Sequence, residues 1–108
     1  KYNSKNSEAA ERYAYIAKFI GLEGNTVDEL VDALINELKS MNKALEIPSC
    51  IKEYEGGIID EAEFNSKLKD VAALAISDAC TGSNPRQPSQ EEMEKLLTAC
   101  FYDKEIDF

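Results

Sequence analysis

The stretch that decides the fold lies between residues 26 and 45 and reads TVDELVDALINELKSMNKAL. Its apolar residues recur every three or four positions, which is the rhythm of one face of an α-helix. That face comprises Val27, Leu30, Val31, Leu34, Ile35, Leu38, Met41 and Leu45. Thr26 with Glu29 three residues later has the pattern of a capping box, which predicts the start of the helix. Pro48 predicts its end, because the residue before a proline is pushed out of the helical region.

Helical patterns also occupy residues 7–20 and the segment that begins at Ser89. Gly21 is placed to stop the first of them, because glycine is common just after a helix end. The apolar stripe of residues 7–20 is predicted to consist of Ala9, Ala10, Tyr13, Ile16, Ala17 and Ile20. Ser89 and Glu92 form a second capping box. The helix after it is predicted to line one side with Met93, Leu96, Leu97, Cys100 and Phe101.

A further helical pattern begins near Asp60, with Glu63 as its capping partner, and continues to about Ala79. Its apolar stripe is loose around residues 65–69, so one long helix and two shorter helices that meet at a bend both stay open. No alternation typical of a β-strand persists along the chain. The sequence therefore predicts an all-α fold, a small helical bundle of about four to five helices, in a single domain over residues 1–108.

The composition excludes several classes of function. The chain has 108 residues with 12 Lys and Arg against 21 Asp and Glu, so its net charge of −9 repels nucleic acid. No apolar run approaches the ~18 residues of a membrane helix, and no imidazole chemistry is open to a chain without histidine. The three cysteines, Cys50, Cys80 and Cys100, fit neither a disulfide framework nor a zinc ribbon. Free thiols of this kind predict that the protein works in the reducing cytoplasm.

Two candidate sites for chemistry are rejected on their residues. Residues 57–64 copy the second half of a calcium-binding EF-hand loop, with Glu63 at its last ligand position. That register places Lys52, Tyr54 and Gly56 where oxygen ligands are needed, so a Gly-Gly turn before an Asp-capped helix is the better interpretation. The many carboxylates, which could in principle pair for acid–base catalysis, are interpreted as a solvated surface with helix-supporting pairs such as Glu91 and Lys95.

The most informative segment is the connection between the last two helices, residues 78–88, which reads DACTGSNPRQP. Its Thr, Ser and Asn side chains can bond to the local backbone. The Arg86 guanidinium can donate hydrogen bonds to a carboxylate on a neighbouring helix. Cys80 is expected at the C-terminal end of a helix, where the helix dipole does not favour a thiolate. We therefore do not expect Cys80 to be an activated nucleophile.

Three segments together resemble one enzyme family. Residues 80–86, CTGSNPR, are similar to the last signature loop of the iron-containing alcohol dehydrogenases. Residues 10–17, AERYAYIA, resemble the helix that follows the metal site in the branch with the bifunctional aldehyde–alcohol dehydrogenases. Residues 45–53, LEIPSCIKE, resemble the Leu-Gly-Ile-Pro-x-x-Ile segment of that branch, with Glu46 in place of the glycine. The resemblance runs in order through nearly all 108 residues.

The resemblance implies that the chain is a fragment of a longer polypeptide. It would be the C-terminal end of a dehydroquinate-synthase-like helical domain in an NAD-dependent, iron-containing enzyme that reduces acetaldehyde to ethanol and carries a fused acyl-CoA reductase half. In this family one Asp and three His hold the iron, and all lie upstream of the matched region. The resemblance therefore implies no catalytic, metal-binding or cofactor-binding residue here, and iron and NAD only in the parent enzyme.

For the 78–88 connection the resemblance implies a place beside the substrate pocket. Cys80, Thr81 and Asn84 would form the pocket wall, and Gly82, Pro85 and Arg86 would shape the loop. The expected partners are the rest of the parent chain and further copies of it, in a homo-oligomer or filament in the cytoplasm. The alternative is a free-standing acidic helical module that docks another protein through an apolar face.

Overall fold

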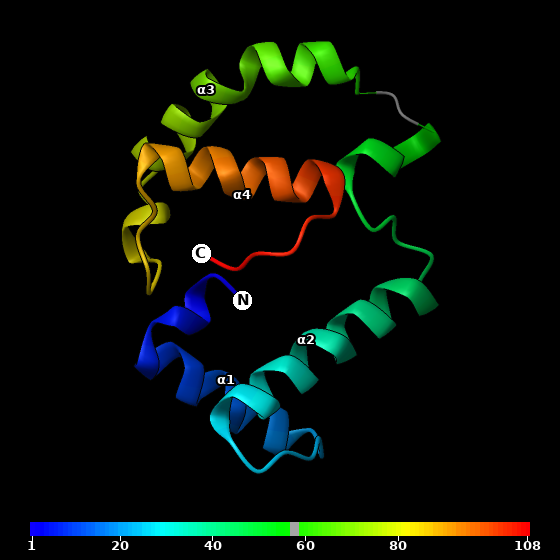
Figure 1. Ribbon diagram of the computed structural model, residues 1–108, viewed down its shortest axis with the longest axis vertical. Helices are drawn as coiled ribbons and strands as arrows, with labels where there is room; N and C mark the ends of the chain where they lie inside the picture. Colours follow the sequence, from blue (N-terminus) through cyan, green and yellow to red (C-terminus); the bar gives the residue numbers. More distant parts are fainter. Residues whose placement is uncertain (57–58) are drawn as a thin grey trace. The chain divides into compact units, whose positions relative to one another are not determined.

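The computed structural model describes residues 1–56 and 59–108, which form four α-helices and no strand (Figure 1). The predicted all-α class is therefore confirmed. The helices are α1 (Ser7–Phe19), α2 (Val27–Ala44), α3 (Glu61–Ser77) and α4 (Gln90–Tyr102), joined in part by the 3₁₀ turns η1 (Asn3–Lys5), η2 (Ile51–Gly56) and η3 (Thr81–Ser83).

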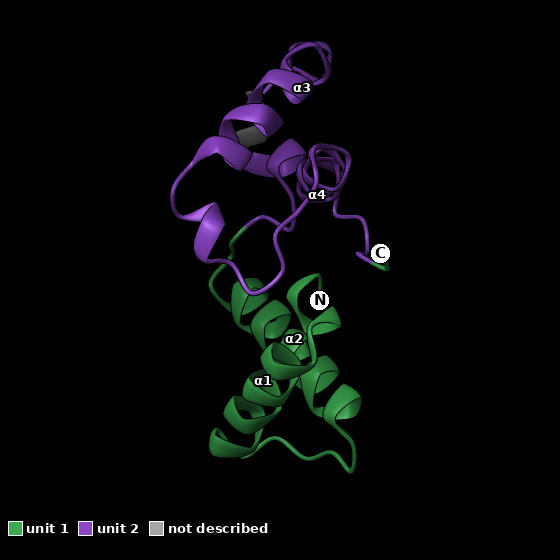
Figure 2. Cartoon of the chain, turned by 90° about the vertical axis from the view of Figure 1, so that its left-hand side faces the viewer, with its two compact units in different colours: residues 1–47, 107–108 green, residues 48–106 purple. Residues whose placement is uncertain are grey.

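The chain divides into two compact units (Figure 2). Unit 1 comprises residues 1–47 and 107–108, and unit 2 comprises residues 48–106. Each unit contains one pair of helices, α1 with α2 and α3 with α4. The single domain expected over the whole chain stays a prediction.

Unit 1 is held together by small residues on α1. The side chains that α1 buries are all alanines, Ala9, Ala10, Ala14 and Ala17. They let α2 come close, so that Leu30 is buried against Ala14 and Ala17, with Leu22 and Leu34 packed around them. The predicted stripe of α1 is partly wrong, because Ile16 and Ile20 are exposed. Ala14 is buried instead, since the face that packs on α2 is the one whose side chains are small enough for close approach.

The start of α2 matches its local signal, whereas its end does not. Thr26 accepts a hydrogen bond from the Glu29 amide at 3.1 Å, as the capping box predicts. The Glu29 carboxylate reaches one residue further back than expected and accepts from the Asn25 amide at 2.6 Å. The helix ends at Ala44, before the proline that was expected to end it. Glu46 supplies the stop, with a left-handed φ of 57°.

Unit 2 packs α3 against α4 around two stacked phenylalanines. The rings of Phe64 and Phe101 lie 4.0 Å apart between centroids, and the Phe101 side chain is fully buried. Asp60 caps α3 by accepting from the Glu63 amide at 2.9 Å, as predicted. The helix then continues to Ser77 as one element, so two separate helices do not form, although the ribbon of α3 changes direction along its length (Figure 1).

Candidate functional site

The candidate site is the connection from α3 to α4, residues 78–89, all of it within unit 2. Helix α3 ends two residues earlier than predicted because Asp78 is extended, with ψ of 133°. The Asp78 carboxylate then accepts a hydrogen bond from the Cys80 amide at 2.7 Å. The Thr81 hydroxyl donates to the carbonyl of Ala75 at 2.6 Å. Together these bonds fold the start of the loop back against the last turn of α3.

The middle of the loop is fixed by side chains that bond to backbone carbonyls. The Ser83 hydroxyl donates to the carbonyl of Cys80 at 2.8 Å. The Asn84 amide donates to the carbonyl of Arg86 at 2.5 Å. The Gln87 amide donates to the carbonyl of Gly82 at 2.7 Å, which closes the turn from the other side. Short polar side chains in this role are the reason that such sequences form ordered connections.

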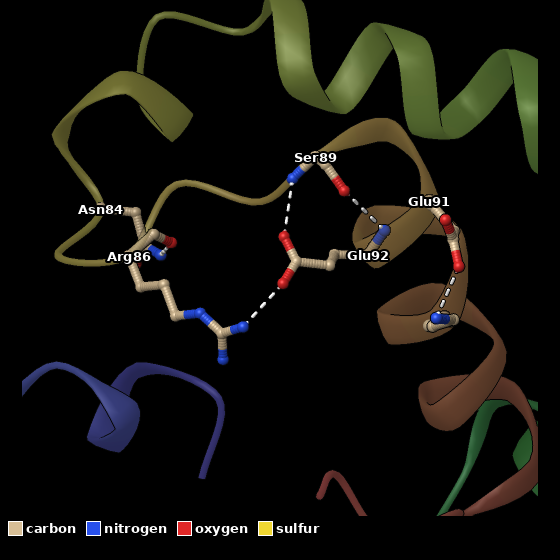
Figure 3. A network of polar contacts seen from close by, with 6 residues as sticks. Asn84, Arg86, Ser89, Glu91 and Glu92 are labelled. Atoms are coloured by element: carbon tan, nitrogen blue, oxygen red, sulfur yellow. Dashed lines mark hydrogen bonds and ion pairs between the residues drawn. The ribbon is translucent and has the colours of Figure 1, made fainter. Parts of the chain in front are cut away.

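A carboxylate on α4 joins the end of the loop to the helix that follows (Figure 3). One oxygen of Glu92 accepts from the Arg86 guanidinium at 2.6 Å, and the other accepts from the Ser89 amide at 2.9 Å. The Ser89 hydroxyl accepts in turn from the Glu92 amide at 3.2 Å, which completes the predicted capping box. The Arg86 and Glu92 side chains are 25% and 28% exposed, so this ion pair is better shielded than an ordinary surface pair.

The six residues singled out in the sequence differ in their exposure and in whether their side chains bond to the loop backbone. Cys80 is exposed and in no disulfide, whereas Thr81 and Asn84 are half-buried and use their polar groups on the backbone. Gly82 is exposed, and an added Cβ would meet nothing within 4 Å. Its φ lies outside the left-handed region, so the loop itself does not require glycine there. Pro85 is exposed.

A second polar cluster was not predicted from the sequence. The Glu61 carboxylate accepts from the Lys52 ammonium at 2.7 Å and from the Tyr102 hydroxyl at 2.6 Å. Lys52 and Lys104 both lie over the Tyr102 ring, at 5.3 and 5.0 Å from its centroid. The hydrogen bond to Lys52, followed by that to Tyr102, lowers the pKa of Glu61. The same bond to Glu61 raises the pKa of Lys52.

This cluster bears on the rejected calcium loop, because Lys52 occupies its first ligand position. In the structure that side chain is an ion-pair donor to Glu61. Gly57 and Ile58, which belong to the predicted Gly-Gly turn and to the same loop pattern, lie outside the described residues. No oxygen-ligand set for calcium can be built on Lys52 at that position.

The donor set of this chain does not fit a bound iron ion. The sequence has no histidine, and in residues 1–56 and 59–108 no three His, Cys, Asp or Glu side chains are grouped as a metal site requires. Among the described helices none is long and apolar enough to cross a membrane.

Comparison with known proteins decides the family. The model of the C-terminal part of the Fe-containing alcohol dehydrogenase family matches residues 1–101. The chain belongs to the iron-containing alcohol dehydrogenase family. The family predicted from residues 80–86 and two further segments is thereby confirmed.

The relatives that this chain matches are much longer proteins, and it spans about a quarter of the first of them. It is 52% identical, over all 108 residues, to the NADPH-dependent butanol dehydrogenase of Clostridium saccharobutylicum, and it covers 26% of that protein. Over 90 residues, 83% of the chain, it is 46% identical to the aldehyde-alcohol dehydrogenase of Clostridium acetobutylicum and covers 10% of it. Over 100 residues, 91% of the chain, it is 31% identical to the bifunctional aldehyde-alcohol dehydrogenase of Escherichia coli and covers 11% of it.

Proposed function

We propose that this chain works as the C-terminal helical part of a longer nicotinamide-dependent alcohol dehydrogenase that reduces a short-chain aldehyde to a primary alcohol. The observation that carries the proposal is the 52% identity to a butanol dehydrogenase across the full 108 residues. Iron and the nicotinamide cofactor would be bound by parts of the parent enzyme outside this chain. The chain by itself would supply structure and one wall of the substrate pocket.

The pocket wall is proposed to be the 80–86 loop, with two kinds of residue in it. Thr81 and Asn84 would hold the wall in place, because their polar groups bond to backbone carbonyls. Cys80 would present its exposed thiol to the substrate, and Gly82 would leave room beside it. Arg86 would fix the distance between this wall and α4 through Glu92, and Pro85 would stiffen the turn before it.

Two parent enzymes are supported by different relatives. The resemblance of residues 45–53, with the 46% identity to an aldehyde-alcohol dehydrogenase, favours a bifunctional enzyme that takes acetyl-CoA through acetaldehyde to ethanol with NADH. The 52% identity to an NADPH-dependent butanol dehydrogenase favours a shorter, single-function enzyme. The mass of the parent polypeptide separates the two, since the matched region is 26% of the second kind and 10% of the first. Reduction of acetyl-CoA by the purified parent would establish the bifunctional enzyme.

The remaining expectations belong to the same proposal. The parent would act in the cytoplasm, in keeping with three cysteines that form no disulfide, and would assemble as a homo-oligomer or filament. A free-standing interaction module is the alternative, and it requires a native polypeptide close to 108 residues long. Intact-mass measurement of the source protein therefore also tests that alternative.

The test of the pocket wall compares two exposed cysteines in the iron-loaded parent enzyme. Cys80→Ala should change KM for the aldehyde several-fold while kcat changes less, because a wall residue affects binding of the substrate and takes no part in the chemistry. Cys100→Ala is the matched control, since Cys100 is exposed on α4, about 15 Å along that helix from its first turn. It should leave both constants unchanged. Equal effects of the two variants, or loss of kcat in folded Cys80→Ala, would contradict the assignment.

Gly82→Ala provides a second, independent readout. Within this chain the added methyl group meets nothing and the backbone is unstrained, so the thermal midpoint should stay the same. If the space beside Gly82 belongs to the substrate pocket, KM should rise most for the bulkiest aldehydes. A KM that is independent of aldehyde size in this variant would place the pocket elsewhere.

A further inference from the structure

Helix α1 carries large apolar side chains on the side that does not pack on α2. Tyr15 is 70% exposed and Phe19 is 80% exposed, and their rings stack with centroids 6.5 Å apart. At 100° per residue these two positions lie roughly opposite the buried alanines Ala10 and Ala17. A helix with apolar residues on opposite sides is typical of the interior of a domain, with a neighbour on each side.

The aromatic pair lies on an open stretch of the α1 surface that also carries charged residues. This stretch comprises Glu8, Glu11, Arg12, Tyr15 and Ile16, all on α1. Arg12 and Glu8 form an ion pair at 3.3 Å, one helical turn apart, with both side chains 78% exposed. Exposed aromatic residues bordered by charged residues that stay in solvent are the arrangement found at binding surfaces. We call Arg12, Tyr15, Ile16 and Phe19 the outer face of α1.

We propose that the outer face of α1 is covered, in the longer enzyme, by an apolar helical segment of the same polypeptide that lies outside these 108 residues. The inference rests on the proposed function, because it needs the longer chain. Relatives of which this chain is 26% or less have a large amount of polypeptide to place against it. Segments near each other in sequence are usually neighbours in space, which favours a segment close to this chain in the parent sequence.

A second copy of the enzyme is the competing occupant, and the size of the face argues against it. A stable contact between two proteins takes roughly 20–30 residues from each partner. The outer face consists of four residues along about two turns of one helix, which suits a single neighbouring helix. Phe19 would fill a gap between side chains of that helix, and the Glu8–Arg12 pair would stay at the rim in water.

The test is site-specific photo-crosslinking in the full-length parent enzyme. The photoreactive amino acid p-benzoylphenylalanine replaces Phe19 in one variant and Tyr15 in a second, in case the first fails to fold. A third variant carries it in place of Glu91, whose side chain is 78% exposed on α4, as the control for a solvated position. After irradiation the products are separated under denaturing conditions and the crosslinked peptides are mapped by mass spectrometry.

The proposal expects a crosslinked product that migrates as a single chain and joins α1 to one defined peptide outside these 108 residues. The Glu91 control should give less than a tenth of that yield. A product of twice the chain mass would identify a second copy as the occupant and overturn the proposal, and so would a yield no higher than the control. Alcohol dehydrogenase activity and intact mass are measured on the same samples before irradiation. Inactive protein of full length that still gives the intrachain crosslink would refute the proposed function and retain the docking inference.

Discussion

Replacing Glu46 by glycine should stabilise the end of α2. Glu46 is held at φ 57°, and this conformation closes the helix through two backbone bonds. The Glu46 amide donates to the carbonyl of Lys43 at 3.2 Å, and the Ile47 amide donates to the carbonyl of Asn42 at 2.9 Å. This pair of bonds is the Schellman pattern, in which the residue at positive φ is usually glycine. The same pattern ends α1, where Gly21 has φ 86°.

The magnitude follows from two opposing effects. An L-residue in the left-handed region costs about 1–2 kcal/mol because its Cβ crowds the following carbonyl. Glycine loses more backbone freedom on folding, which costs about 0.5–1 kcal/mol. Glu46→Gly should therefore stabilise this helix end by about 0.5–1 kcal/mol. Since a tenfold change in an equilibrium constant corresponds to about 1.4 kcal/mol, local opening should become roughly two- to fivefold rarer.

Native-state hydrogen exchange of the Ile47 amide measures this opening directly, because that amide holds the outer bond of the motif. Glu46→Ala is the control, since it removes the carboxylate and keeps the Cβ at positive φ. It should leave the exchange rate of the Ile47 amide close to its rate in the chain with Glu46. Gly21→Ala should show the opposite effect and speed exchange of the Leu22 amide, which bonds to the carbonyl of Ala17 at 2.9 Å. If Glu46→Ala slows exchange as much as Glu46→Gly, charge controls this helix end, and the argument from φ is refuted.

Two further predictions concern unit 2. Phe101→Ala should lower the free energy of unfolding by about 3–5 kcal/mol, because the fully buried ring stacks on Phe64 and its loss leaves a cavity. Denaturant unfolding measures this free energy. A loss below about 1 kcal/mol would mean that the stability of unit 2 does not depend on this stack. Lys52→Met should raise the pKa of Glu61 toward its ordinary value in a carboxyl NMR titration, and an unchanged titration would show that the Lys52 bond does not lower the pKa. Because the pKa of Glu61 is lowered in the folded chain, its bonds to Lys52 and Tyr102 stabilise the fold above the unfolded pKa, and this contribution is lost as the pH falls through the folded value.

Helix starts could be predicted from the sequence because their signals are local. Thr26, Asp60 and Ser89 each accept a hydrogen bond from the amide three residues later, as their spacing to a glutamate indicates. The end of α2 could not be predicted, because Glu46 carries no intrinsic preference for positive φ. Pro48 predicts a helix end from its residue type. The helix ends before it, at Ala44, because Glu46 adopts a positive φ that its residue type does not indicate.

The buried side of α1 was mispredicted for a different reason. Its sequence places large apolar residues on the side away from the alanines as well, so periodicity alone cannot say which side meets a partner within the chain. The alanine side packs on α2, and Ile16, which the stripe included, is left exposed with Tyr15 and Phe19. The error and the docking inference thus have the same origin: α1 has two apolar sides, and the described residues cover one of them.

Polar contacts in unit 2 divide in the same way between local and distant pairs. Arg86 and Glu92 are six residues apart across a turn, so a pairing with a carboxylate on the next helix could be predicted. Glu61 and Tyr102 are 41 residues apart, and only the packing of α3 on α4 brings them together. No pattern in a single sequence marks such a pair.

The structure also separates residues that a family motif presents as equals. In the 80–86 loop, Thr81 and Asn84 bond to the backbone and Arg86 bonds to α4, so substituting any of them should first disturb the loop itself. Substituting Cys80 or Gly82 should not disturb the loop in this way, because the thiol is exposed and the glycine is neither strained nor crowded. If substituting Cys80 or Gly82 changes KM for the aldehyde, the cause would therefore be a lost or altered contact with a group outside this chain, such as the substrate. They are consequently the positions where the pocket-wall proposal can be tested without first damaging the fold.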